Sequence, residues 1–180
     1  EDLKSAVPHV PPCKPASGKS VAIIGAGPAG LAAAHFLARE GHAVTVADRH
    51  DKAGGTLRSN TTEAELPREV LDAELAQLER LGIQFKLNVE LGRDLTAEGL
   101  ARGFEAVLLT VGEISPRETH NLGVTLGPSG IKTDPNTGWT SGRNVFAAGS
   151  AVKPVKQLVK AMSDGRAVAE CVHRHLFGIA

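Results

Sequence analysis

The chain has 180 residues, of which 20 are basic and 20 acidic, so its formal net charge is +0 at pH 7. This balance argues against a nucleic-acid or membrane-surface binder, because such proteins carry a basic excess. Hydrophobic residues make up 42% of the chain, and no apolar stretch approaches the roughly 18 residues of a membrane-spanning helix. Disorder and a membrane span are therefore both poor interpretations.

The two cysteines, Cys13 and Cys171, form no CxxC pair and no zinc-ligand cluster. A disulfide scaffold and a metal site are therefore not expected, and a reduced, cytoplasmic protein is the default interpretation. The sequence starts at Glu1 rather than at Met, which suggests one piece of a longer protein.

The composition changes at Ser20. Residues 1–19 contain four of the ten prolines among polar side chains, which favours extended polyproline geometry, and they are predicted to form a linker or arm. Over residues 20–180 short apolar runs alternate with helical patterns, which predicts one α/β domain with a parallel sheet covered on both faces. In chain order, the predicted elements are a strand at Val21–Ile24, a helix at Leu31–Arg39, a strand at Ala43–Ala47, a helix at Arg68–Leu81, strands at Ile83–Leu87 and Ala106–Val111, turns and short β pieces over residues 113–144, a strand at Val145–Ala148 and a helix at Val155–Phe177.

The last predicted helix carries three further expectations. His173 and His175, near its end, are expected to be solvated rather than to bind a metal. Three lysines at and just before its start have the spacing of one helix face, which either docks an acidic partner or is an ordinary solvated face: Lys153, Lys156 and Lys160. Its apolar side chains are available for burial, with the cysteine in the core: Val155, Val159, Met162, Cys171 and Val172.

The sharpest motif is a GxGxxG fingerprint, Gly25-Ala26-Gly27-Pro28-Ala29-Gly30. It follows a predicted strand, opens a predicted helix and precedes a second strand that ends before Asp48, which is the context of a dinucleotide-binding βαβ unit. The first glycine permits the tight turn, the second lets the backbone approach a pyrophosphate, and the third lets the helix pack against the strand. Asp48 lies 23 residues after Gly25, near the offset of an acid that binds a ribose hydroxyl. A glycine-rich turn without a ligand is the weaker alternative.

These residues carry a family resemblance. The run Val21–Leu31, followed by Gly54-Gly55, resembles the FAD-binding start of the pyridine nucleotide-disulfide oxidoreductase superfamily. Leu66–Leu71 and the helix after it are similar to the glutamate synthase small-subunit group of FAD/NAD(P) oxidoreductases, and Val145–Gly149 resembles the second FAD signature. The resemblance covers most of residues 20–178. It implies a Rossmann-like FAD-binding domain with a parallel sheet and a small β meander, preceded by a linker similar to the one that follows an iron-sulfur domain in this group.

The resemblance also implies which residues bind FAD. The fingerprint would hold the diphosphate, Asp48 the adenosine ribose, and Val89 the adenine through its backbone. Residues 55–58 would lie along the flavin, residues 149–150 would touch the ribityl chain, and residues 155–158 would face the ring. No catalytic residue and no metal ligand is implied. The implied FAD-binding residues are Gly25, Gly27, Pro28, Ala29, Gly30, Asp48, Arg49, Gly55, Leu57, Arg58, Val89, Gly112, Gly149, Ser150, Val155, Lys156, Gln157 and Leu158.

The chain departs from the family pattern at three places. About thirty residues separate Gly112 from Val145, where the family inserts a second GxGxxG domain for NAD(P)H, so no second nucleotide domain is expected. Ser150 stands where the family has an aspartate. Residues 59–63, Ser-Asn-Thr-Thr-Glu, replace the Gly-Ile-Pro segment that borders the flavin in the family.

These observations lead to the hypothesis of an FAD-dependent oxidoreductase domain that carries electrons between redox partners, iron-sulfur or flavin centres, in a larger complex. The N-terminus of a helix starting at Val155 would stabilise negative charge on a reduced flavin. One alternative is an NAD(P)H-dependent flavin reductase whose nicotinamide domain is excised or supplied by another chain. A second alternative is an assembly module that keeps the fold without redox function.

Overall fold

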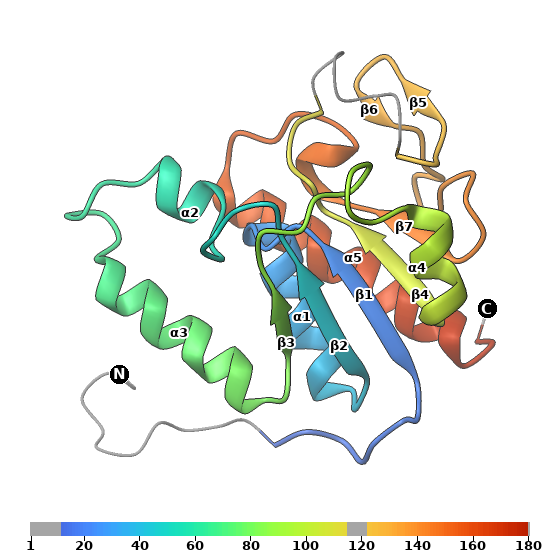
Figure 1. Ribbon diagram of the computed structural model, residues 1–180, viewed down its shortest axis with the longest axis horizontal. Helices are drawn as coiled ribbons and strands as arrows, with labels where there is room; N and C mark the ends of the chain where they lie inside the picture. The colour runs from blue at the N-terminus through green and yellow to red at the C-terminus, as the bar shows by residue number, and fades with distance from the viewer. Residues whose placement is uncertain (1–11, 115–121, 180) are drawn as a thin grey trace.

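A five-stranded parallel sheet forms the centre of the molecule, in the order β3-β2-β1-β4-β7 (Figure 1). The structure is a computed structural model and describes residues 12–114 and 122–179. The central strands are continuous apolar runs, as is typical of parallel strands buried on both faces. The strands are β1 (Ser20–Ile24), β2 (Ala43–Ala47), β3 (Gln84–Lys86), β4 (Ala106–Leu109) and β7 (Val145–Ala147).

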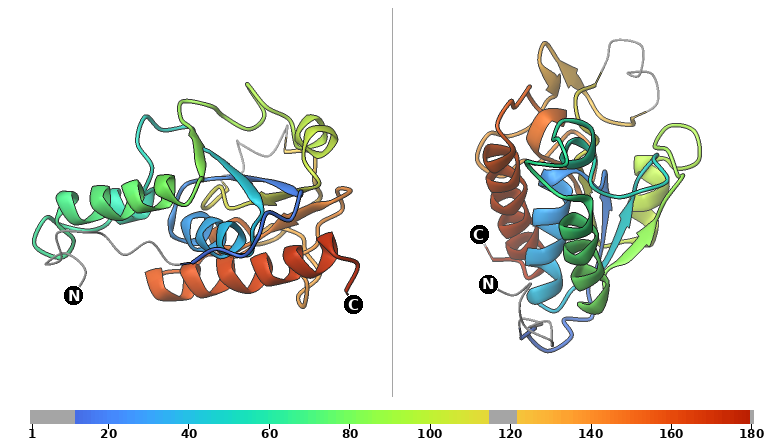
Figure 2. Two further views of the ribbon diagram at one scale, coloured as in Figure 1. Left: turned by 90° about the horizontal axis from the view of Figure 1, so that it is seen from below. Right: turned by 90° about the vertical axis from the view of Figure 1, so that its left-hand side faces the viewer.

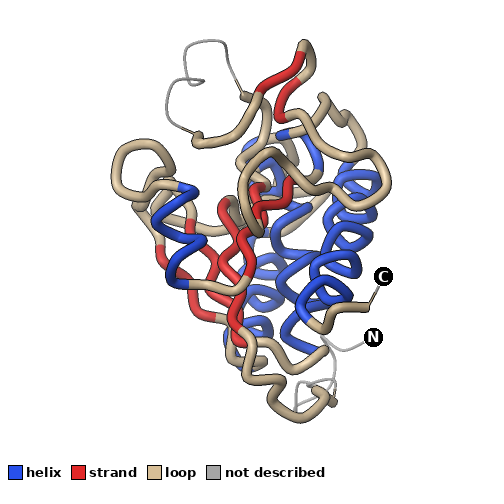
Figure 3. The backbone as a smooth tube through the Cα atoms, turned by 90° about the vertical axis from the view of Figure 1, so that its right-hand side faces the viewer, coloured by secondary structure: helices blue, strands red, loops and turns tan. Residues whose placement is uncertain are grey.

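Helices cover both faces of this sheet, and Figures 2 and 3 show them in separate layers. α1, α3 and α5 lie on one face, and α4 lies on the other. The helices are α1 (Pro28–Arg39), α2 (Thr56–Ser59), α3 (Arg68–Arg80), α4 (Ala97–Gly103) and α5 (Leu158–Leu176), with a 3-10 helix η3 (Gly149–Ala151) and an antiparallel hairpin of β5 (Leu126–Gly127) and β6 (Gly130–Ile131). None of the helices within the described ranges is both long and apolar enough to cross a membrane.

The alternation of side chains along β1 divides the core into two clusters. Val21 and Ile23 join the buried side chains under α1 and α5. Ala22 and Ile24 join the buried side chains on the face of α4, where the hairpin residue Ile131 is also buried. The predicted α/β class with a parallel sheet is therefore confirmed, and a two-stranded hairpin stands where the small meander was expected.

Helices α1 and α5 pack closely against each other through a glycine of α5. Gly165 of α5 lies directly against the backbone of α1, because a Cβ on this residue would be 2.1 Å from the carbonyl oxygen of Ala29. The buried residues of α5 share one stripe with this glycine: Ala161, Gly165, Ala169 and Val172. The close approach holds the middle of α5 against the start of α1. The first residue of α5, Leu158, and Ala161 line the cleft at the carboxyl ends of the strands.

Several expectations for this helix are wrong. α5 begins at Leu158 rather than at Val155, so the residues before it belong to a loop. Val159 and Met162 are 78% and 44% exposed, because they lie outside the stripe that contacts α1. Cys171 is half-buried rather than in the core, with its thiol 3.5 Å from the carbonyl oxygen of Asn136.

The lysines do not share one helix face either. Only Lys160 is helical, and it forms an ion pair with Asp164 one turn later. Lys153 and Lys156 precede the helix and are exposed. Three short helices, α2, α4 and η3, were not predicted.

Part of the predicted N-terminal linker, residues 1–11, lies outside the described residues. Residues 12–19 form neither helix nor strand until β1 starts at Ser20, but they are attached to the turn between α1 and β2. The N–H of Lys14 donates to the carbonyl oxygen of Arg39 at 2.8 Å, and the N–H of Ser17 donates to that of Gly41 at 2.9 Å.

A chain of polar side chains reinforces this attachment. The Ser17 hydroxyl lies 2.7 Å from Nδ1 of His42, and Nε2 of His42 lies 2.8 Å from Nδ1 of His173. Nε2 of His173 is in turn 3.4 Å from a carboxylate oxygen of Glu40. The expectation that His173 is solvated is therefore wrong. His175 is also half-buried, against the rings of Trp139 and Phe146.

This cluster makes stability depend on pH. Burial, reinforced by the neighbouring His173, lowers the pKa of His42, while Glu40 acts in the opposite direction. Burial and two nearby arginines lower the pKa of His35 as well. Below a pH of about 6.5 these histidines therefore bind protons more readily in the unfolded chain than in the folded protein. The free energy of unfolding should fall as the pH decreases. Urea denaturation at about pH 7.5 and about pH 5.5 measures this loss.

The loss should be smaller in His42→Gln, because the substituted side chain does not titrate. A wild-type protein whose free energy of unfolding is the same at the two pH values would contradict the assignment of His42 as a neutral, buried group.

Candidate functional site

A cleft of about 1360 Å³ lies at the carboxyl ends of the parallel strands, which is where open α/β sheets bind ligands. Its walls come from the turn after β1, the loops after β2, β3 and β4, and the loop before α5. Most of the residues predicted to bind FAD line it: Gly25, Gly27, Pro28, Ala29, Asp48, Arg49, Gly55, Arg58, Val89, Gly112, Ser150, Val155, Lys156, Gln157 and Leu158. Gly30, Leu57 and Gly149 do not.

The fingerprint turn is built by close contacts between backbones. Gly25 has a φ of +109°, and a Cβ there would be 2.2 Å from the carbonyl oxygen of Thr110. A Cβ on Gly30 would be 1.9 Å from the carbonyl oxygen of Gly25, so the third glycine shapes the turn rather than the cleft wall. These two positions have the packing roles that the spacing predicts.

Thr110 is a site residue that the sequence reasoning missed. Its buried hydroxyl donates to the carbonyl oxygen of Gly25 at 2.9 Å and lies 3.1 Å from that of Ile24. The hydroxyl therefore joins the end of β4 to the fingerprint turn. The sequence does offer a signal for Thr110, because it is a polar residue that directly follows the apolar run of β4.

Gly27 differs from the other two fingerprint glycines. Its φ is −83°, which any residue adopts, and a Cβ there would meet nothing within 4 Å. Gly27 also precedes the first residue of α1, whose positive dipole end therefore faces the cleft. The turn thus leaves an open, electropositive place where an anionic group can approach the backbone.

Asp48 follows β2 and is buried, although it reaches the cleft. One carboxylate oxygen accepts the N–H of Ala26 at 2.6 Å, and the other accepts the N–H of His50 at 2.8 Å and lies 2.8 Å from its Nδ1. The carboxylate therefore fixes the fingerprint turn, and its remaining lone pairs are available to a ligand hydroxyl. The N–H of Val89 donates to the carbonyl oxygen of Asp48 at 2.9 Å, which joins the loop after β3 to the end of β2.

The glycine pair after β2 lets α2 approach the fingerprint. Gly54 donates its N–H to the carbonyl oxygen of Ala26, and a Cβ on Gly55 would be 2.9 Å from Cα of Gly27. Leu57 packs against the core rather than into the cleft. Arg58 lines the cleft, but its guanidinium donates to the carbonyl oxygen of Ala53 and to Asp72.

The residues after β7 come to the same cleft. Gly149 has a φ of +67° and lies behind the wall, where a Cβ would be 3.0 Å from Cβ of Ala29. The Ser150 hydroxyl accepts the N–H of Val155 at 3.3 Å. Because α5 starts at Leu158, the segment 155–157 enters the cleft as a loop and not as the first turn of a helix.

The described ranges hold no group of three or more histidine, cysteine or acidic side chains arranged to bind a metal ion. Between β4 and β7 the described residues form turns and the hairpin β5–β6. The arrangement is suited to binding an extended anionic ligand along the strand ends.

Comparisons with known proteins agree with this geometry. Residues 23–82 match the family model of an NAD(P)-binding Rossmann-like domain. The chain is 43% identical over 107 residues to the glutamate synthase [NADPH] small chain of Mycobacterium tuberculosis, a match that covers 59% of this chain and 22% of that protein. It is 48% identical over 92 residues to the NAD-dependent dihydropyrimidine dehydrogenase subunit PreT of Escherichia coli, covering 51% of this chain and 22% of that protein. The chain thus matches less than a quarter of the length of these relatives.

Among solved structures, THI4 of Thermovibrio ammonificans has the same fold, with a TM-score of 0.61 at 16% identity over 88% of this chain and 90% of that one. The matches confirm the Rossmann-like fold and the resemblance to the glutamate synthase small-subunit group. They indicate a site for a flavin or nicotinamide dinucleotide.

Gly27→Ala should weaken dinucleotide binding without unfolding the protein. The added methyl group would meet no protein atom within 4 Å but would occupy the path expected for the diphosphate, and such overpacking costs about 1–3 kcal/mol, which is roughly 5- to 150-fold in Kd. Titration with FAD, followed by quenching of its fluorescence, measures the effect. Gly103→Ala is the matched control, because a Cβ on Gly103 also meets nothing within 4 Å and Gly103 does not line the cleft.

Thermal unfolding of both variants should match that of the wild type. Equal FAD affinities in Gly27→Ala and Gly103→Ala would show that the fingerprint does not bind the diphosphate. Gly30→Val is unsuitable for this purpose, because its Cβ would break the turn itself.

Proposed function

We propose that this chain is the FAD-binding domain of an oxidoreductase and that it passes electrons between redox partners in a larger complex. One observation supports this function above all. Two segments that each resemble an FAD signature, the fingerprint at residues 25–30 and the stretch from 145 into the following loop, end at one cleft although they are far apart in the sequence. A nicotinamide fingerprint alone does not require the second segment.

The residues of the cleft fit FAD in a definite order. The diphosphate would lie in the free space beside the α-carbon of Gly27, at the N-terminus of α1. Asp48 would accept hydroxyl groups of the adenosine ribose, with Arg49 beside it, and the carbonyl of Val89 would contact the adenine. Ser150 and the segment 155–158 would line the ribityl and ring end.

A bound flavin supplies the ability to accept two electrons and to release them one at a time. The protein's part is to bind the cofactor, to orient it and to leave one edge accessible. Lys156, exposed at the cleft, would place a positive charge near the ring. The N-terminus of α5, expected at Val155, lies three residues later at Leu158, which also lines the cleft, and its dipole would act in the same direction.

The absence of a nicotinamide fold between β4 and β7 in the described residues favours electron transfer to a protein partner over direct hydride transfer. Both named relatives are subunits, a small chain and a subunit PreT, which is consistent with work inside a complex. An iron-sulfur centre as the partner and a cytoplasmic location are part of the same proposal. The alternative is a reductase whose NAD(P)H site lies on another segment or chain, since the relatives are named for NADPH and NAD.

The visible spectrum of the purified chain tests FAD binding. After reconstitution and desalting, flavin bands should persist at a stoichiometry of about one FAD per chain, because in this proposal the cleft would contact the cofactor along its whole length. A colourless protein that does not take up FAD would overturn the proposed function and would favour an assembly module.

Anaerobic mixing with NADPH or NADH separates the two redox functions. The isolated chain should keep its flavin absorbance on the time scale of turnover, whereas chemical reduction should bleach it. Rapid bleaching by either nicotinamide would favour the reductase alternative.

A further inference from the structure

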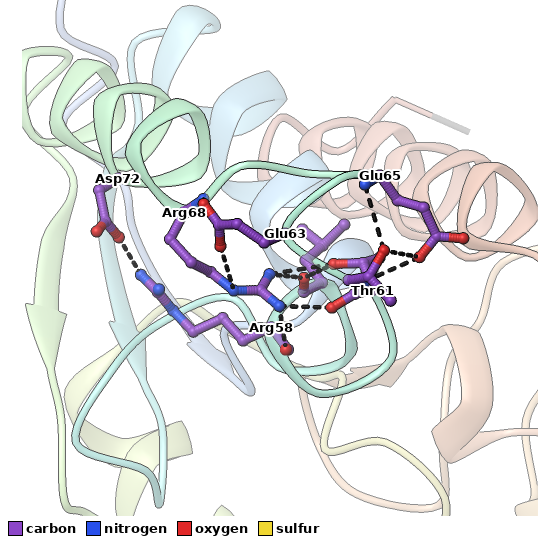
Figure 4. Close-up of polar contacts among 8 residues, drawn as sticks. Arg58, Thr61, Glu63, Glu65, Arg68 and Asp72 are labelled. Carbon is purple, nitrogen blue, oxygen red and sulfur yellow. Dashed lines mark hydrogen bonds and ion pairs between the residues drawn. The ribbon is translucent and has the colours of Figure 1, made fainter.

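Arg68, the first residue of α3, forms hydrogen bonds to several residues of the loop that precedes it, residues 57–66 (Figure 4). Its Nη1 donates to the carbonyl oxygen of Leu57 at 2.9 Å and to the hydroxyl of Thr61 at 3.1 Å. Its Nη2 donates to the carbonyl oxygens of Arg58 and Thr61 at 2.9 Å and 2.5 Å. Its Nε faces the carboxylate of Glu63 at 3.8 Å. A single guanidinium therefore binds backbone or side-chain oxygens of four residues.

The loop held in this way is a wall of the cleft. Six of the residues 57–66 line the cleft: Arg58, Ser59, Asn60, Thr61, Glu65 and Leu66. Arg68 itself does not line it. The contribution of Arg68 to a ligand must therefore act through the loop.

The loop has few other supports of its own. α2 is a single turn of helix, and the Thr61 hydroxyl donates to the carbonyl oxygen of Leu57. The second half is closed by Thr62, whose N–H and hydroxyl both donate to Glu65 at 2.8 Å. These bonds are local, and two contacts tie residues 57–61 to α3. The side chain of Arg58 pairs with Asp72, whereas Arg68 binds main-chain carbonyl oxygens of the segment itself.

The chemistry of the contact requires a guanidinium. Three of its acceptors are main-chain carbonyls, and the Arg68 side chain is only 31% exposed, so these carbonyls would lose their partners if it were removed. A planar fork reaches several fixed acceptors at once, whereas the point charge of a lysine does not.

We propose that Arg68 is a positioning residue that folds residues 57–66 into the wall against which the flavin ring lies. This inference rests on the proposed function, because it assigns the ring end of FAD to this wall. Residues 59–63 differ from the ring-bordering segment of the family, so this chain builds its own border, and Arg68 is the group that fixes its shape.

Arg68→Met and Arg68→Lys test the assignment, with Arg80→Met at the far, exposed end of α3 as the matched control. Hydrogen exchange of residues 57–66 is measured first, in FAD-free protein. Exchange should accelerate about tenfold or more in Arg68→Met, with wild-type rates in β1 and α1. Arg68→Lys should show nearly the same acceleration, because it keeps the charge and loses the fork, and Arg80→Met should show none.

The FAD complex supplies the second measurement. Arg68→Met and Arg68→Lys should bind FAD about tenfold more weakly than the wild type and should shift the visible flavin bands. Arg80→Met should do neither. A purely structural role of Arg68 in α3 would lower the thermal unfolding temperature without moving the flavin bands.

Wild-type exchange in residues 57–66 of Arg68→Met, or full recovery in Arg68→Lys, would overturn the inference. Accelerated exchange with an unchanged flavin spectrum would also overturn it, because the loop would then not border the ring. If the wild type itself does not bind FAD, the proposed function fails with the ring assignment, and the exchange rates still decide whether Arg68 holds the loop.

Discussion

The structure depends on how closely backbone can approach backbone at the start of α1. Three glycines allow it: Gly25 lies against the carbonyl of Thr110, Gly30 against the carbonyl of Gly25, and Gly165 against the carbonyl of Ala29. These contacts bring the ends of β1 and β4 and the middle of α5 together beside the cleft, which Gly25, Ala29 and Thr110 line. A methyl group at any of the three positions would push these elements apart, so the cleft exists only because these side chains are absent.

The parts of the fold set by local sequence could be predicted, and the parts set by distant contacts could not. The strands and the fingerprint turn follow from short apolar runs and from glycine spacing, which determine backbone geometry directly. The start of α5 was misplaced because the side chains of residues 155–157 fit a helical pattern, whereas in the structure these residues form a loop and the helix begins at Leu158. The pairing of His42 with His173 was invisible, since 131 residues separate them.

The candidate site shows the same division. Most residues that were assigned to the cleft by motif and resemblance do line it. A motif of this kind specifies the backbone turns that form a ligand site, so its residues lie together. Thr110 and Arg68 were missed because both donate hydrogen bonds to main-chain carbonyl oxygens. Every residue has such a carbonyl, so the sequence does not show which one accepts the bond. Asp48 has both a structural role and a place in the site. Its carboxylate accepts the N–H of Ala26, which fixes the fingerprint turn, and the residue also lines the cleft.

The pairing of β4 with β7 has a consequence for how such a protein can change its architecture. The two strands are neighbours in the sheet, in the register Val107↔Val145, and this register is set by their own hydrogen bonds. The hairpin β5–β6 that connects them is anchored by Gly130, whose α-carbon lies against the carbonyl of Ala151. The hydrogen bonds between the two strands lie outside the connection that joins them. The connection between β4 and β7 is therefore a place where a whole domain can be inserted or removed, in evolution or by design, while the nucleotide cleft keeps its shape.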